Sequence, residues 1–109
     1  MGKFEIYRAT NNEFRFRLKA SNGEIILKSE GYGSKQGCIN GIQSVKTNAP
    51  IDGRYERRTS SSNHPYFVLK AANGEIIGVS EQYSSGAAME NGIQSVKTNA
   101  PSARADDLS

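Results

Sequence analysis

Residues that commonly carry catalysis are scarce in this chain of 109 residues. Cys38 is its only cysteine and His64 its only histidine, so catalysis by a thiolate–imidazole pair would need these two residues together. A single cysteine also excludes an internal disulfide and a zinc site built on two thiolates. Cys38 falls on an apolar stripe with helical spacing, which favours a small buried hydrophobe over a reactive thiol. His64 falls in a polar turn.

Two pairs of glutamates recur at an interval of 51 residues, Glu24 with Glu75 and Glu30 with Glu81. Glu30 and Glu81 each stand in a Ser-Glu-x-Tyr segment, and a glutamate near a tyrosine can take part in acid–base catalysis. A simpler hypothesis is that this segment connects strand to helix through its own hydrogen bonds, and the sequence favours it. We therefore expect a protein that is not an enzyme, without catalytic residues, metal or cofactor.

A duplication organises the chain. Residues 2–50 align with residues 53–101 without a gap, and 27 of the 49 aligned positions are identical. Two copies are too few for a solenoid, so we expect a single domain over residues 1–101 in which both units share one core. The last residues, 102–109, are short and polar, and we expect them to form a disordered tail.

Each unit predicts three strands. In the first, apolar and charged residues alternate over 4–8 and 14–19, which is typical of half-buried strands. Asn22-Gly23 predicts a two-residue type I′ hairpin turn, after which residues 25–28 form the third strand. The second unit repeats this order with strands predicted over 55–58, 66–70 and 76–79.

An amphipathic helix closes each unit. In the first unit, apolar residues recur with a period near 3.6 at Cys38, Ile42, Val45 and Ala49. A serine precedes each helix as the predicted N-cap, and a proline prevents its continuation. The sequence thus predicts an α+β fold, a tandem repeat of β-β-β-α units forming one antiparallel sheet with two helices packed on one face, related by a pseudo-two-fold axis.

Three motifs recur in order in both units: the LKA-x-NGE-II hairpin, the Ser-Glu-x-Tyr connection and the NGIQSVKTNAP helix end. With these motifs, residues 2–101 resemble the YegP-like family of small bacterial proteins with one or two such repeats. The resemblance implies a single antiparallel sheet with helices on one face, which single-repeat members would form as homodimers. It supplies no catalytic or ligand-binding residues that could be carried over to this chain, so it leaves the function open.

Composition restricts the possible functions further. No apolar run approaches the roughly 20 residues needed to cross a bilayer, and the start of the chain has no secretory signal, so we expect a cytoplasmic protein that does not bind membranes. The net charge is +3. Residues 1–50 hold eight Lys or Arg against four Glu, so the basic character belongs to the first unit.

The strand pattern also predicts the composition of the sheet face that points away from the helices. If Phe14, Phe16 and Leu18 face the helices, the alternate residues face away, and the turn length fixes which residues lie opposite one another. The predicted interaction surface is basic in the first unit and apolar–aromatic in the second. It comprises Tyr7, Arg15, Arg17, Lys19, Ile26 and Lys28, with Tyr66, Val68, Lys70, Ile77 and Val79.

Two functions suit such a surface. Contiguous exposed apolar patches usually mark protein contacts, so we expect a non-catalytic protein-interaction or structural module whose partner is an unidentified protein or a second copy of the chain. The alternative is single-stranded nucleic-acid binding, with tyrosines stacking on bases and arginines along phosphates, although the net charge is low for that function. Small-molecule binding stays open without a motif to support it.

Overall fold

The computed structural model describes residues 2–109 and confirms the α+β fold. Each unit contributes three strands and a helix in the predicted order, and Ser34 and Ser85 cap the two helices. The first unit comprises β1 (Lys3–Arg8), β2 (Phe14–Lys19), β3 (Ile25–Lys28) and α1 (Lys35–Asn48). After a short 3₁₀ turn (Asp52–Arg54), the second comprises β4 (Tyr55–Thr59), β5 (Pro65–Lys70), β6 (Ile76–Val79) and α2 (Gly86–Asn99), and β7 (Arg104–Asp107) follows. Within residues 2–109, no helix is long and apolar enough to cross a membrane.

The strands form one sheet in the order β4-β5-β6-β3-β2-β1-β7. The two units meet at β3 and β6, where the ladder pairs Lys28 with Val79. These residues are equivalent in the duplication, so the predicted pseudo-two-fold axis passes between them. Leu27 and Gly78, the preceding residues of the two strands, are also equivalent and lie beside this axis.

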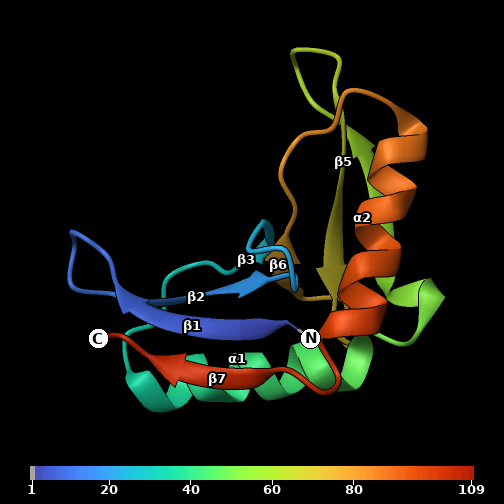
Figure 1. Ribbon diagram of the computed structural model, residues 1–109. Coiled ribbons are helices and arrows are strands. Elements are labelled where there is room, and N and C mark those ends of the chain that lie inside the picture. Colours follow the sequence, from blue (N-terminus) through green and yellow to red (C-terminus); the bar gives the residue numbers. More distant parts are fainter. Residues whose placement is uncertain (1) are drawn as a thin grey trace.

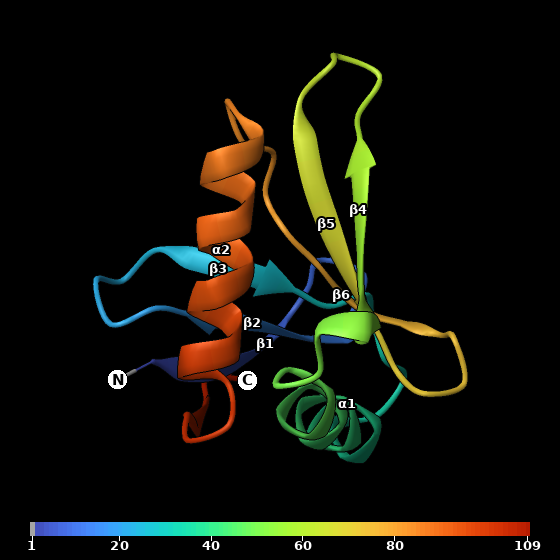
Figure 2. The same cartoon turned by 90° about the vertical axis from the view of Figure 1, so that its right-hand side faces the viewer.

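The sheet bends sharply between its two halves. In Figure 1, β1 and β2 run across the view, while β5 runs upward beside α2. Helix α1 lies below the first half, and the view in Figure 2 shows α2 crossing in front of β3. Each helix contacts strands of both units, α1 on β2, β5 and β6, and α2 on β5 and β3. Both helices therefore cover the same face, on the outside of the bend.

One continuous core fills the space between the sheet and the helices. Its largest fully buried side chains come from both units, and equivalent residues such as Phe16 and Phe67, or Ile42 and Ile93, recur in it. Because each helix reaches strands of the other unit, neither unit buries its apolar surface alone. The duplication therefore produces one domain and not two.

The β2–β3 turn differs from the prediction. Gly23 is its only residue at a positive φ, 86°, whereas a type I′ turn needs two. The N–H of Ala20 donates to the carbonyl of Glu24 at 2.9 Å, so the loop contains three residues. The predicted two-residue turn is therefore wrong, and the equivalent loop of the second unit closes in the same way, from Ala71 to Glu75.

A β-bulge compensates for the longer loop. Lys19 lies opposite Ile25, and the register then shifts so that Arg17 lies opposite Lys28 as predicted. Ile26 is the extra residue of this bulge, and such a residue leaves the strict alternation of the strand. Ile25, and not Ile26, consequently takes the outward position.

The C-terminal tail is ordered where disorder was expected. Residues Arg104–Asp107 form β7, which pairs in parallel with β1, and Ala103 before it is buried in the core. Lys35 Nζ of α1 holds Asp107 Oδ2 at 2.7 Å. The prediction of a disordered tail is therefore wrong for these residues, because backbone hydrogen bonds to an open strand edge need no apolar pattern.

Deleting residues 104–109 should lower the free energy of unfolding by only about 1 kcal/mol, because the strand is short and its side chains are mostly exposed. Amide exchange in β1 should become faster, since that strand would become an open edge. Urea unfolding and hydrogen exchange measure the two effects. Truncation after Asp107 keeps β7 and is the matched control; an equal effect in both variants would contradict this role of the strand.

Candidate functional sites

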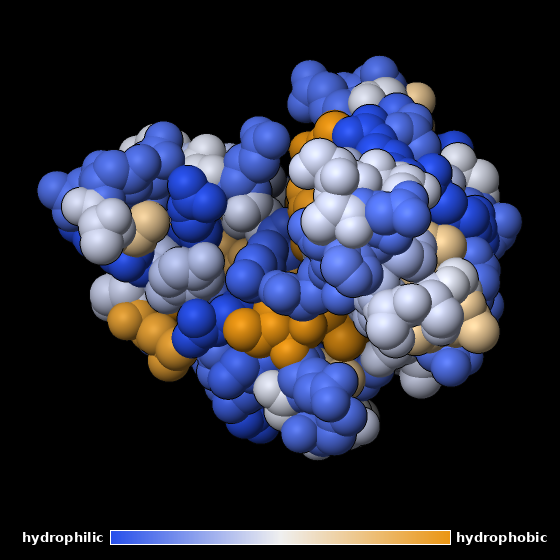
Figure 3. Space-filling model, turned by 90° about the horizontal axis from the view of Figure 1, so that it is seen from above, coloured by the Kyte–Doolittle hydropathy of each residue, from blue (hydrophilic) through white to orange (hydrophobic). Residues whose placement is uncertain are grey.

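The cross-strand register assembles a continuous sheet face that no helix covers. We call it the outer sheet face. It lies inside the bend of the sheet, and the view from above in Figure 3 shows a hollow between two largely hydrophilic lobes, with apolar side chains in and beside it. Its charged and aromatic residues in the first half are Lys3, Glu5, Tyr7, Arg15, Arg17, Lys19 and Lys28, with Arg104 and Asp106 of β7.

A nearly buried carboxylate organises the first half of the outer sheet face. The side chain of Glu5 is 7% exposed. Its Oε1 accepts from Arg17 Nε at 2.8 Å and lies 3.2 Å from Lys19 Nζ, while its Oε2 lies 3.5 Å from Lys3 Nζ. The hydrogen bond from Arg17, followed by the interaction with Lys19, lowers the pKa of Glu5 from 4.5 to about 2. The carboxylate thus fixes three cationic side chains that would otherwise repel one another.

Two arginines on this face have specific environments. The guanidinium of Arg17 lies over the ring of Tyr7, 4.7 Å from its centroid, so one face of that ring is occupied. Arg15 lies 3.7 Å from Glu13 through Nη2, but its buried Nε has no hydrogen-bond partner within residues 2–109. The Arg15 side chain as a whole is 36% exposed, so the rest of its guanidinium can reach an external acceptor.

The second half of the outer sheet face is less apolar on its surface than predicted. Glu56 is bound by Lys70, with Nζ and Oε1 2.7 Å apart, and by Arg58. Val68, between Glu56 and Val79 in the register, is only 1% exposed. Near the bend of the sheet its neighbours enclose it. The predicted exposed apolar half is therefore wrong at Val68, whereas Tyr66 and Val79 stay half-buried.

Ile26 and Ile77 do not belong to the outer sheet face. Both are buried in the core, because each is the extra residue of a bulge and points to the helix side. Ile26 lines a pocket against α2 of the other unit. The remaining predicted surface residues lie on the outer sheet face as the register required.

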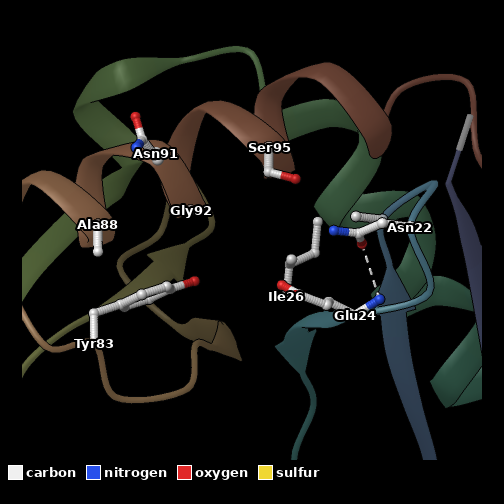
Figure 4. A pocket seen from close by; sticks show the side chains of 9 residues that line it. Asn22, Glu24, Ile26, Tyr83, Ala88, Asn91, Gly92 and Ser95 are labelled. Atoms are coloured by element: carbon white, nitrogen blue, oxygen red, sulfur yellow. Dashed lines mark hydrogen bonds between the residues drawn. The ribbon is translucent and has the colours of Figure 1, made fainter.

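A second site, which the sequence did not predict, lies where the units meet on the helix side. An open pocket of about 240 Å³ separates the β2–β3 turn from Tyr83 and α2. In Figure 4 the Tyr83 hydroxyl points into the opening, and Asn91 and Ser95 project from α2 above it. Asn22 and Glu24 of the turn form the opposite wall. Exposed polar residues that are identical in both repeats were the signal that could have revealed it.

The aromatic connector residues explain the helix glycines. The ring of Tyr83 stacks on Phe67 with centroids 6.3 Å apart, and a Cβ built on Gly92 would lie 2.6 Å from its Cζ. Burial, followed by Glu81 and Glu24, raises the pKa of Tyr83. Tyr32 and Gly41 repeat this contact in the first unit. The glycines are therefore required by the tyrosine rings that cross the helices.

The other residues considered for chemistry lie apart. Cys38 is fully buried, and burial raises its thiol pKa to about 11, as expected for a core residue. His64 is exposed in a turn, 3.1 Å from the hydroxyl of Ser62. The connector is held as predicted, because Ser29 Oγ accepts from the N–H of Phe16 and donates to the Glu30 carbonyl, both at 2.8 Å. Among residues 2–109, no three His, Cys, Asp or Glu side chains gather as a metal site.

The fold defines a class of protein in which two β-β-β-α units complete one sheet about a pseudo-two-fold axis. The chain matches the domain of unknown function DUF1508 twice, at residues 9–56 and 60–107, with the same offset as the internal repeat. It belongs to this family, whose members include the UPF0339 proteins called YegP. The resemblance found in the sequence is thereby confirmed.

Relatives and solved structures agree over nearly the whole length. The chain is 54% identical to a UPF0339 protein of the ptx operon 5′ region of Stutzerimonas stutzeri, covering 94% of this chain and 93% of that protein. It is 49% identical to YegP of Escherichia coli over 97% of this chain and 96% of YegP. Solution structures of the Shewanella oneidensis UPF0339 protein and of Escherichia coli YegP superimpose with TM-scores of 0.92 and 0.93, at 50% and 48% identity. Both cover 98% of this chain, and 91% and 92% of their own chains.

Proposed function

We propose that this protein is a non-catalytic interaction module whose outer sheet face binds an acidic protein segment. The observation that carries the proposal is the excess of positive charge on the outer sheet face. The register places eight Lys or Arg residues on this face against three carboxylates, and Glu13 and Glu81 from flanking segments pair with Arg15 and Lys28. An excess of three positive charges, equal to the net charge of the whole chain, is therefore concentrated on this one face. A concave face with such an excess attracts an acidic partner and orients it.

The contacts on the face support the same partner. Carboxylates of the protein already hold most of the cations in place, so little conformational freedom would be lost on binding. Arg15 is held less closely, with Nη2 3.7 Å from Glu13 and its buried Nε without a partner within the described chain. The side chain of Arg15 as a whole is 36% exposed, so the accessible part of its guanidinium can bind a carboxylate presented by the partner. Self-association through this face would bring like charges together, so we favour a different protein as the partner.

Fluorescence anisotropy with a labelled glutamate-rich peptide tests this function. We expect saturable binding that weakens steeply with added salt. Exchanging both Arg15 and Lys28 for alanine should weaken it about tenfold or more, because each cation contributes a charge-assisted contact. Lys46→Ala removes one positive charge from helix α1 instead, and is the control for a single charge removed away from this face.

The nucleic-acid alternative is decided by the same experiment with a labelled oligothymidine. Arg17 already covers one face of the Tyr7 ring, which leaves less room for base stacking. Tighter binding of the oligonucleotide than of the peptide, lost in the same double variant, would replace our proposal with nucleic-acid binding. Absence of peptide binding at low salt would contradict the proposal of an acidic protein partner.

We further propose that the protein acts in the cytoplasm, where a lone buried thiol such as Cys38 stays reduced.

A further inference from the structure

The pocket at the junction of the units, on the helix side, is separate from the outer sheet face. It takes its walls from both units, with the β2–β3 turn from the first and Tyr83 with α2 from the second. Its larger and polar lining residues are Asn22, Glu24, Ile26, Tyr83, Asn91 and Ser95, and small residues including Ala88 complete it. A site built across a junction exists only in the assembled fold, so no local segment pattern reveals it.

The duplication repeats this set of residues. Eight of the nine lining residues are identical to their equivalents 51 positions away, which for these six are Asn73, Glu75, Ile77, Tyr32, Asn40 and Ser44. Over the whole alignment only 27 of 49 positions agree. The second junction differs in two details, because Asn40 Oδ1 accepts from Gln36 Nε2 at 3.0 Å and Gly37 stands where the first junction has Ala88. The duplication therefore places nearly the same residues at a second junction.

Three polar groups border the first junction. The ring of Tyr83 packs on Phe67, and its hydroxyl lies against Gly92 of α2, whereas Glu24 and Asn91 are exposed. Among the contacts of residues 2–109, the Tyr83 hydroxyl, the Glu24 carboxylate and the Asn91 amide have no hydrogen-bond or ion-pair partner. In contrast, the buried hydroxyl of Tyr55 donates to the carbonyl of Ala49 at 2.8 Å. Asn91 also lowers helix propensity where it stands.

The chemistry of these groups selects the ligand. Glu24 offers a carboxylate that only accepts hydrogen bonds, Tyr83 can accept beside it, and no Lys or Arg lines the pocket. Ile26 and Ala88 provide an apolar surface next to these acceptors. We propose that the two junctions are a pair of equivalent binding sites for a small primary amine, with its ammonium group on Glu24 or Glu75 and its short aliphatic part on the isoleucine.

Amide chemical shifts in a titration with n-butylamine hydrochloride test the proposal, with n-butanol and sodium chloride as parallel titrations. Gly23 and Gly92 report on the first junction, and Gly74 and Gly41 report on the second. We expect saturable shifts at both junctions with the amine, at millimolar concentrations suited to so small a ligand. The alcohol should bind at least about tenfold more weakly than the amine, because it lacks the positive charge.

Glu24→Gln gives the decisive comparison, since the second junction of the same molecule is the control. Binding at Gly23 and Gly92 should weaken about tenfold, while Gly74 and Gly41 keep the wild-type response. Glu75→Gln should show the reverse. Shifts that do not saturate, equal shifts with the alcohol, or a Glu24→Gln variant that still binds at the first junction would each overturn the proposal. The glutamate-rich peptide test of the outer sheet face is unaffected by any of these results.

Discussion

Replacing Gly78 with leucine should destabilise the protein by about 3 kcal/mol. A Cβ on Gly78 would lie 2.6 Å from both Cγ and Cδ2 of Leu27, and Leu27 is fully buried. The two residues are equivalent in the duplication and lie beside the pseudo-two-fold axis, where space exists for one large side chain. A second leucine would force the core apart, because buried side chains pack without spare volume.

Exchanging the two residues should restore most of the lost stability. Leu27→Gly alone leaves a cavity and should cost about 4 kcal/mol, whereas the double variant Leu27→Gly/Gly78→Leu places the leucine on the other strand. We expect its free energy of unfolding to lie within about 1 kcal/mol of the wild type, as for coupled neighbours in a double-mutant cycle. Urea unfolding measures all four proteins. Additive losses would show that the two positions do not share one space.

Replacing Glu5 with glutamine should cost about 2–3 kcal/mol, because it removes a buried charged acceptor and leaves three cations close together. Glu56 is the equivalent residue in the second unit, with its side chain 42% exposed and two cationic partners. Glu56→Gln is therefore the matched control, and it should cost less than about 1 kcal/mol. Equal losses in thermal or urea unfolding would contradict the organising role of Glu5.

The difference in stability between wild type and Glu5→Gln should depend on pH. In the folded protein the pKa of Glu5 is lowered from 4.5 to about 2, so its contribution is fully present above pH 4.5 and is lost as the pH falls toward 2. Wild type and Glu5→Gln should therefore converge in stability over this range. A constant difference between their stabilities from neutral pH to pH 2 would contradict the shifted pKa.

Strands and helices followed from local patterns, because alternation and helical spacing reflect which side of each element is buried. The turn did not, since Asn22-Gly23 serves a two-residue or a three-residue loop equally well. The difference of one residue in loop length decides whether Ile26 faces outward or toward α2. The tail sequence that forms β7 pairs through its backbone, so its side chains carried no signal of the strand.

The candidate sites were predicted in part. Arg15 and Arg17 were placed on the correct face because alternation in β2 is strict. Val68 was expected to be exposed, since a flat sheet would expose it, but the bend between the halves encloses it. The junction pocket could not be predicted from local patterns, because it forms between the β2–β3 turn of one unit and Tyr83 with α2 of the other.

Leu27 and Gly78 also bear on how such a chain can evolve. In an ancestral pair of identical half-length chains, one residue type would have to serve on both sides of the axis, so a leucine would meet a leucine and a glycine would leave a void. In a single chain that carries both halves, each half can mutate independently, which makes the large–small pair available. Covalent linkage therefore permits a packing that a symmetric dimer cannot reach, and it leaves the two halves of the outer sheet face free to differ in the same way.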